Sequence, residues 1–219
     1  MYPTSEMPPF PVSPDLDDYP DISGELPTLG ILASGSGSNF EKLVRAARSE
    51  GFPVGIGGLI CNNPGAACLE RAERLEVPSR VIDHRDSETR ETFDADVATA
   101  LDEMGADWVA MAGWMRISTP RLLEPYRDRI INLHPSLLPA FRGASAVEDA
   151  LDAGVRMTGC TVHIVTEAVD AGPILAQAAV PVRDGDVVAT LQERIHEAEH
   201  WLFPRAIALA IARSRSDTP

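Results

Sequence analysis

The sequence predicts a single α/β domain with a mostly parallel mixed sheet and helices on both faces. From Thr28 onward, short and nearly continuous apolar runs alternate with segments of helical period, as expected for strands that are buried on both faces. Near the C-terminus two apolar runs follow one another with no helix between them, which indicates an antiparallel hairpin. The 219 residues show no internal repeat and suffice for one sizeable core.

The first part of the domain is predicted to consist of five strands connected by helices. The strands are expected at Leu29–Ala33, Val54–Cys61, Arg80–Asp83, Trp108–Ala112 and Arg129–His134. The helices are expected at Asn39–Ser49, Ala66–Leu75, Ser87–Met104 (capped by Ser87) and Ala146–Leu151. Strands joined through helices become parallel neighbours, so this part is Rossmann-like.

The C-terminal part completes the domain, which we expect to span residues 28–213. The hairpin strands are Cys160–Val165 and Ile174–Val182, with Asp170–Pro173 at the turn. A helix from about Val187 to Trp201 is expected to break at Pro204, because proline lacks the N–H that a helix interior needs. A last helix then covers Ala206–Arg213.

Residues 1–27 form a tail that is rich in proline and in acidic side chains and contains no lysine or arginine. Such a segment buries too little apolar surface to offset the entropy lost on ordering. We therefore expect the tail to be flexible or draped over the domain.

Composition and charge exclude several classes of partner. The net charge of −14 disfavours nucleic acid as a partner, because phosphate backbones are bound by Lys and Arg. The three cysteines contain no C-x-x-C pair, so neither a disulfide framework nor a zinc site is expected. No apolar run reaches membrane-spanning length, and the N-terminus lacks a secretion signal. We expect a cytoplasmic protein that does not contact a membrane.

A loop rich in glycine and serine, Ser34–Asn39, lies between the first strand and the first helix. Glycines let the backbone approach a ligand closely, and the free amides at a helix N-terminus favour a phosphate group. The loop matches neither a Walker motif nor a serine-hydrolase elbow. A phosphate site and an ordinary tight turn, with Ser38 as helix cap, both remain open.

Asn132 and His134 stand two apart at the end of the fifth strand, so their side chains share one face. A carboxamide donor beside an imidazole suits stabilisation of an oxyanion together with proton transfer. The alternative is a structural pair that makes turn hydrogen bonds. Asp170 could orient His134 or simply form an Asx turn.

Three candidate segments meet at one edge of the predicted sheet, because ligands of open α/β sheets bind outside the carboxyl ends of the strands. They are the phosphate loop, the Asn132–His134 pair, and Gly113–Ile117 after the fourth strand. His163 is interpreted as a buried core histidine. The i, i+3, i+4 set of His196, Glu199 and His200 is interpreted as a polar helix face rather than a metal site.

With these residues in view, the chain resembles the folate-dependent phosphoribosylglycinamide formyltransferases. Seven ordered segments carry the resemblance: Ala33–Asn39, Cys61–Pro64, Met111–Ile117, Asn132–Pro139, Gly159–His163, Val169–Ile174, and Glu199–His200 with Phe203–Pro204. The resemblance implies formyl transfer from 10-formyltetrahydrofolate to glycinamide ribonucleotide, with no metal, by a monomer or homodimer.

The resemblance also implies a role for each matching residue. Asn132, His134 and Asp170 would be catalytic. The phosphate and ribose of the ribonucleotide would contact Gly35, Ser36, Gly37, Ser38, Asn39 and Glu199. The folate would be bound by Met115, Arg116, Ile117, Asn132, Val165 and Asp170, with residues 165–170 forming a loop over the pterin.

Two other functions remain as alternatives: a formyltetrahydrofolate hydrolase, which shares the catalytic trio, and a nucleotide-binding module without catalysis. The chain also departs from the resemblance at Arg142 and Ser145, where many of these enzymes have Pro and His. This departure leaves the substrate and folate contacts of that loop open.

Overall fold

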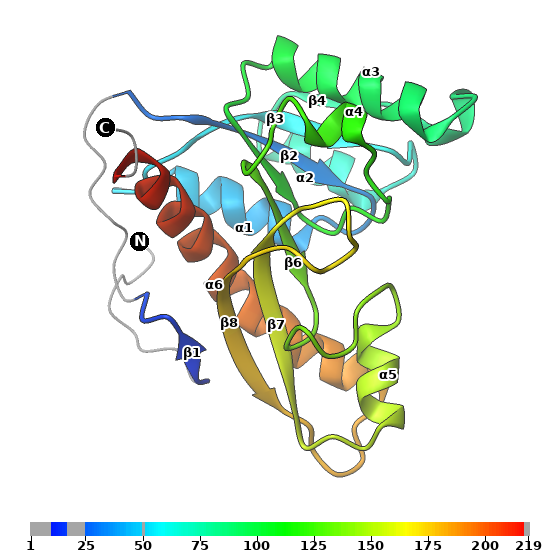
Figure 1. Cartoon of the computed structure of the whole chain (residues 1–219), viewed down its shortest axis with the longest axis vertical. Helices are drawn as coiled ribbons and strands as arrows, with labels where there is room; N and C mark the ends of the chain where they lie inside the picture. Colours follow the sequence, from blue (N-terminus) through cyan, green and yellow to red (C-terminus); the bar gives the residue numbers. More distant parts are fainter. Residues whose placement is uncertain (1–9, 17–24, 50, 217–219) are drawn as a thin grey trace.

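A computed structural model describes residues 10–16, 25–49 and 51–216, and Figure 1 shows their arrangement. The strands are β1 (Val12–Ser13), β2 (Thr28–Ala33), β3 (Gly55–Cys61), β4 (Ser79–Val81), β5 (Trp108–Met111), β6 (Ile130–His134), β7 (Met157–Ile164) and β8 (Ile174–Pro181). The helices are α1 (Ser38–Ala47), α2 (Ala67–Arg74), α3 (Arg90–Glu103), α4 (Pro120–Leu123), α5 (Ala146–Asp152) and α6 (Val188–Ser216), with a 3-10 turn at His84–Asp86.

All eight strands belong to one sheet in the order β1-β8-β7-β6-β5-β2-β3-β4. The pairs from β6 through β5, β2 and β3 to β4 are parallel. The pairs β6–β7, β7–β8 and β8–β1 are antiparallel. The predicted fold, a mostly parallel sheet with a C-terminal antiparallel hairpin, is confirmed.

Helices cover both faces of the sheet, because the side chains of each strand alternate between two apolar clusters. On β2, Leu29 and Ile31 belong to the cluster under α1, α2 and α6, whereas Leu32 faces the cluster under α3 and α4. Within the described residues, no helix is both long and apolar enough to cross a membrane.

The predicted break at Pro204 is wrong, since α6 continues through it. Leu202, Phe203 and Ile207 are completely buried against the sheet. Burial of each such side chain contributes about 1.5–3 kcal/mol, and together they outweigh the cost of roughly 3 kcal/mol for proline in a helix interior. Tertiary packing therefore overrides the local signal.

The long third helix begins later than predicted. Thr89, rather than Ser87, is its N-cap, because Thr89 and Thr92 form a reciprocal capping box. This exchange satisfies amides that would otherwise have no partner at the helix start.

Part of the N-terminal tail lies against the domain. Val12 pairs with Ala178 in β8, and the N–H of Ala179 donates to the carbonyl of Pro11 at 2.9 Å. Phe10 meets Trp201 of α6 edge-on. Residues 10–16 thus show the draped alternative, while residues 1–9 and 17–24 lie outside the described part of the chain.

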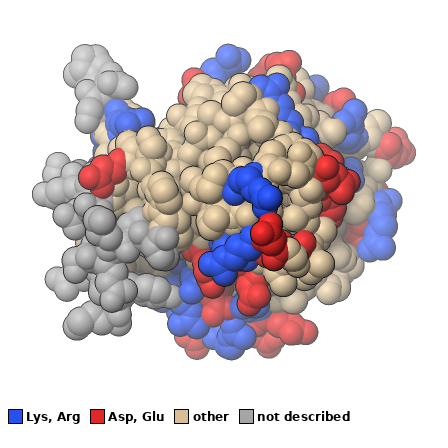
Figure 2. Space-filling view, turned by 90° about the horizontal axis from the view of Figure 1, so that it is seen from below, with Lys and Arg blue, Asp and Glu red and all other residues tan. Residues whose placement is uncertain are grey.

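On the face seen in Figure 2, acidic and basic side chains are interspersed around a broad area without charge. Ion pairs join neighbouring elements. Arg156 contacts Asp184 at 2.5 Å, and Arg194 contacts Asp186 at 2.8 Å. In each of these pairs a positive side chain lies next to a negative one, so neither pair adds to a patch of a single charge sign.

Candidate active site

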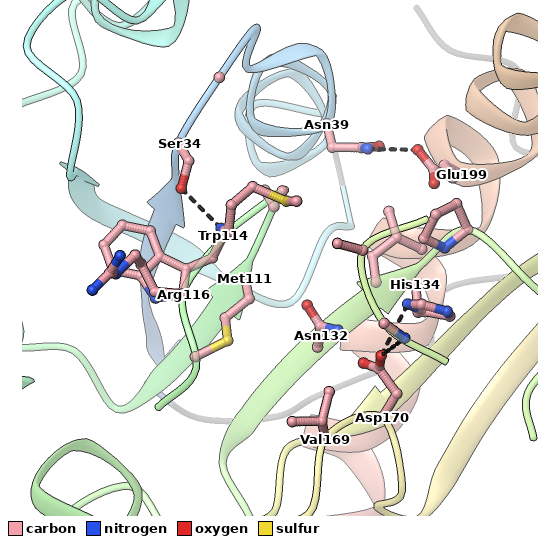
Figure 3. A pocket seen from close by; sticks show the side chains of 18 of the residues that line it. Ser34, Asn39, Met111, Trp114, Arg116, Asn132, His134, Val169, Asp170 and Glu199 are labelled. Atoms are coloured by element: carbon pink, nitrogen blue, oxygen red, sulfur yellow. Dashed lines mark hydrogen bonds and ion pairs between the residues drawn. The ribbon is translucent and has the colours of Figure 1, made fainter. Parts of the chain in front are cut away.

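A cavity of about 600 Å³ opens at the carboxyl ends of β2, β5 and β6. Figure 3 shows side chains from the strand ends, from α1 and α6 and from the β7–β8 loop converging on it. Every site residue predicted from the sequence lines this cavity: Gly35, Ser36, Gly37, Ser38, Asn39, Met115, Arg116, Ile117, Asn132, His134, Val165, Asp170 and Glu199.

The loop between β2 and α1 has a conformation that depends on glycine. Gly37 is the N-cap of α1 and has φ 75°, a left-handed conformation that disfavours other residues. A Cβ added at Gly37 would stand 2.6 Å from the Cβ of Cys68 in α2. Ser38 is therefore not the cap, and no side chain caps the amides of α1. The residues at the start of α1 line the cavity, where an anion can accept hydrogen bonds from helix amides.

Asn39 and Glu199 bring α1 and α6 together at one end of the cavity. The amide Nδ2 of Asn39 donates to Oε2 of Glu199 at 2.8 Å (Figure 3). Glu199 is buried, which contradicts its interpretation as part of a solvated helix face. Burial raises the pKa of Glu199, against the opposing effects of His196 and the Asn39 hydrogen bond. Its carboxyl group is an acceptor inside the cavity.

The side chain of His134 lies between two acceptors. Its Nε2 donates to the carbonyl of Phe141 at 2.8 Å, and its Nδ1 lies 3.4 Å from Oδ2 of Asp170. These two contacts fix the orientation of the imidazole ring in the cavity.

Asp170 is bound by the backbone amide of Gly143 and lies next to the rings of His134 and His163. The N–H of Gly143 donates to its Oδ2 at 2.9 Å, and Nε2 of His163 lies 3.6 Å from its Oδ1. Burial by itself raises the pKa of Asp170, but the contacts with His163, Gly143 and His134 outweigh burial and lower it. Asp170 also has φ 49°, which costs backbone energy and is typical of functional positions.

His163 is a site residue that the sequence prediction placed in the core. It is buried as predicted, and its Nδ1 donates to the carbonyl of Ile164 at 2.9 Å. Its Nε2 then accepts from Nδ2 of Asn132 at 3.2 Å. The β6–β7 register places Asn132 opposite His163. If the predicted fifth strand had been paired antiparallel with the first hairpin strand, the sequence could have revealed this contact.

The segment after β5 forms another wall. Trp114 is buried and stacks on Phe93 with ring centres 5.9 Å apart. The guanidinium of Arg116 lies over the Phe93 ring, 5.7 Å from its centre. Met115 and Ile117 are 64% and 55% exposed. Alternate residues therefore anchor the segment and present apolar side chains to the cavity.

The loop that departs from the family resemblance contributes mainly its backbone. Arg142 is exposed and is not among the residues that line the cavity, whereas Gly143 and Ala144 are. Because Asp170 is bound by the Gly143 amide, this contact does not depend on the side chains at 142 and 145.

In the described part of the chain, no cluster of three or more His, Cys, Asp or Glu side chains could hold a metal ion. His196 lies 3.8 Å from Glu199, and its ring stacks on that of His200 at 6.1 Å. Burial lowers the pKa of His200 to about 4. His196 and Glu199 line the cavity, whereas His200 is not among the lining residues.

Comparison with known proteins identifies relatives of the whole domain. Residues 29–207 match the family described as formyl transferase. The chain is 40% identical over 177 residues to phosphoribosylglycinamide formyltransferase of Bacillus subtilis, covering 81% of this chain and 91% of that protein. It is 45% identical over 181 residues to the trifunctional purine biosynthetic protein adenosine-3 of Homo sapiens, covering 83% of this chain and 18% of that protein.

The fold agrees with solved structures as well. The crystal structure of glycinamide ribonucleotide transformylase 1 from Symbiobacterium toebii has a TM-score of 0.85 and 42% identity, covering 87% of this chain and 91% of that one. The phosphoribosylglycinamide formyltransferase from Bacillus halodurans has a TM-score of 0.82 and 38% identity, covering 85% and 96%.

The chain therefore belongs to the formyl transferase family. It spans only about a fifth of the length of its trifunctional relatives. Within the family, the relatives matched over nearly their whole length place it among the phosphoribosylglycinamide formyltransferases, which are transferase enzymes.

Proposed function

We propose that this enzyme transfers the formyl group of 10-formyltetrahydrofolate to the amine of glycinamide ribonucleotide in de novo purine biosynthesis. The observation that carries the proposal is the meeting of Asn132, His134 and Asp170 between two different halves of one cavity. One half has uncapped helix amides and a buried carboxyl group, and the other has exposed apolar side chains. The two halves match two chemically different substrates.

The first half suits the ribonucleotide. The N-terminal amides of α1 and the hydroxyls of Ser36 and Ser38 supply donors for a phosphate group. Glu199 supplies an acceptor for ribose hydroxyls, and Asn39 orients it. We assign the phosphate to Gly35–Asn39 and the ribose to Glu199.

The second half suits the folate. Met115, Ile117 and Val169 are about half exposed or more and line the cavity, so a flat ring system would cover apolar surface that is now open. Val165 begins the loop that ends at Asp170 and closes this side. Arg116 provides a cation for a carboxylate. We assign the folate to Met115–Ile117 and residues 165–170.

The residues between the halves perform the transfer. The amine nitrogen attacks the formyl carbon, a C–N bond forms, and the carbonyl oxygen becomes an oxyanion. Nδ2 of Asn132 has a second N–H that can donate to this oxygen while the first is bound by His163.

Proton transfer falls to His134. Because its Nε2 is bound by Phe141, Nδ1 carries the proton that can move. Asp170 stabilises the imidazolium, while the proton lost by the attacking amine balances the one gained by the folate nitrogen when the old C–N bond breaks.

The decisive experiment is an absorbance assay for the folate product with and without glycinamide ribonucleotide. We expect turnover only when the ribonucleotide is present. Formate release without it would instead support the hydrolase, and binding without formyl turnover would support a non-catalytic module.

We further propose that the enzyme acts in the cytoplasm as a monomer or homodimer on small molecules, without nucleic acid or membrane as a partner. The net charge of −14 supports this view.

A further inference from the structure

Two cysteine side chains lie in contact next to the phosphate loop. Cys61 is the last residue of β3, and Cys68 is in the first turn of α2. Their Sγ atoms are 3.4 Å apart, and both side chains are fully buried. The turn that follows Cys61 is at the surface, where residues 63–65 are exposed. The pair is thus buried directly beneath a surface turn.

The hydrogen bonds of the pair distinguish the two sulfurs. The Cys68 thiol donates to Sγ of Cys61. Cys61 Sγ also accepts from the backbone N–H of Asn63 at 3.4 Å and lies 3.2 Å from the Asn63 carbonyl oxygen, to which its thiol donates. The hydrogen bond from Cys68 lowers the pKa of Cys61 to about 7, although burial opposes the shift. Burial raises the pKa of Cys160, although a backbone hydrogen bond with Ala178 opposes the shift. Cys61 is thus the sulfur of the pair whose thiolate form is more favoured, and thiolates rather than thiols react.

We propose that Cys61 and Cys68 form a reversible disulfide when a hydroperoxide oxidises the enzyme, and that this modification weakens ribonucleotide binding. The Cys61 thiolate attacks one peroxide oxygen, which gives a sulfenic acid and releases water in the case of hydrogen peroxide. Sγ of Cys68 then attacks the Cys61 sulfur, an S–S bond forms, and a second water leaves. In total, two thiols lose two electrons and two protons, and the peroxide is reduced to two waters.

The disulfide would act on the loop through three contacts. The N–H of Cys68 donates to the carbonyl of Gly35 at 3.0 Å, and Gly37 packs against the Cβ of Cys68. Arg71, one turn further along α2, donates to the carbonyl of Ser36 at 2.8 Å. Shortening the sulfur distance from 3.4 Å to about 2.05 Å draws the two residues together by side-chain rotation and by approach of the two backbones. Displacement of the Cys68 backbone is passed to the loop that is bonded to it.

The chemical part is tested by mass spectrometry. After brief treatment with hydrogen peroxide, the protein is denatured in an alkylating reagent and digested with trypsin. Cys61 and Cys68 fall in one peptide, residues 49–71, and Cys160 falls in another, residues 157–183. We expect peptide 49–71 to lose two hydrogens and to carry no alkyl group, and dithiothreitol to reverse the change.

Two controls sharpen this test. Met157 is 47% exposed and lies outside the cavity lining, so its sulfoxide reports that the oxidant acted. Cys160→Ala should still form the linkage, whereas Cys68→Ala should not. Oxidation of Met157 while peptide 49–71 remains fully alkylated, or over-oxidation of Cys61 without a linkage, would overturn the disulfide.

The functional part rests on the proposed function and uses the same samples. The oxidised enzyme should show a rise in KM for glycinamide ribonucleotide on the order of tenfold, equivalent to about 1.4 kcal/mol, which dithiothreitol restores. The reversal separates this effect from sulfoxide at Met115, which a thiol does not reduce. A linkage that forms without changing KM would disprove the coupling to the loop but not the modification. If the reduced enzyme showed no formyl transfer, the proposed function would fail independently.

Discussion

The imidazole Nδ1 of His134 lies 3.4 Å from Oδ2 of Asp170, although 35 residues separate them in the chain. His134 ends β6, and Asp170 belongs to the loop between β7 and β8. With Phe141 on the other side of the ring, the histidine has an oxygen acceptor at each nitrogen. Phe141 and Asp170 therefore fix the orientation of the ring in the cavity.

Removal of either donor should slow the chemical step. Loss of one oxyanion donor typically costs ~10²-fold or more in rate, so Asn132→Ala and His134→Ala should each lower kcat by that factor with smaller effects on KM. Steady-state assays of folate product measure this. His84→Ala, which changes a histidine outside the cavity lining, is the control. Near wild-type turnover in either site variant would refute its catalytic role.

His163 should act through Asn132. His163→Leu removes the acceptor that orients the Asn132 amide, so kcat should fall, but less than in Asn132→Ala. The double variant should be no slower than Asn132→Ala alone, because the two residues share one interaction. Additive losses in this double-mutant cycle would show that His163 acts by another route.

Glu199→Gln should raise KM for the ribonucleotide and change kcat little. The substitution keeps an acceptor for Asn39, whereas Glu199→Ala leaves the buried amide without a partner, at a cost of about 1–3 kcal/mol. Kinetics with the ribonucleotide varied would separate the two parameters. An unchanged KM would remove Glu199 from the ribose site.

The burial of Glu199 also predicts that the stability of the protein depends on pH, and Glu199→Gln tests this. Because burial raises the pKa of Glu199 above 4.5, the folded state holds this proton more tightly than the unfolded state. The contribution of Glu199 to stability is therefore present at low pH and is lost as the pH rises through the folded-state pKa. Thermal unfolding should show Glu199→Gln gaining stability relative to wild type as the pH rises above 4.5. A difference independent of pH would contradict the burial of a titrating carboxyl group.

Asp170 should contribute to stability with the opposite pH dependence. Its pKa lies below 3.8 in the folded state, so its carboxylate stabilises the fold above that pH, and the contribution is lost as the pH falls through the folded-state pKa. The melting temperature of wild type should therefore fall relative to that of Asp170→Asn on acidification below 3.8. In addition, Asp170→Asn should reduce kcat, since its amide cannot balance the charge of the His134 imidazolium.

Gly37 and Gly35 form a matched pair for the loop. Gly37→Ala combines a positive φ with a contact of 2.6 Å to Cys68, so it should lower the free energy of unfolding by about 1–3 kcal/mol. Gly35→Ala has open space and should leave stability nearly unchanged. Denaturant unfolding curves of the two variants compare them directly. Equal stabilities would show that the loop relaxes around the new Cβ.

The sequence alone determined which segments are strands and helices and which residues stand at the ends of the strands. Apolar runs located the strands, and the i, i+2 spacing put Asn132 and His134 on one face of β6. Because the carboxyl ends of parallel strands share one edge, the phosphate loop and residues 113–117 could also be placed there. These inferences need only the chemistry of neighbouring residues.

Only the tertiary structure decided which distant side chains meet. The β6–β7 register brings His163 to Asn132, and the packing of α6 on α1 brings Glu199 to Asn39. Likewise, burial of α6 carries the helix through Pro204, and pairing with β8 orders residues 12–13. Such contacts depend on register and on the sum of buried surface, which no single local pattern contains. For that reason His163 joined the predicted Asn132, His134 and Asp170 only when its neighbours across the sheet were in place.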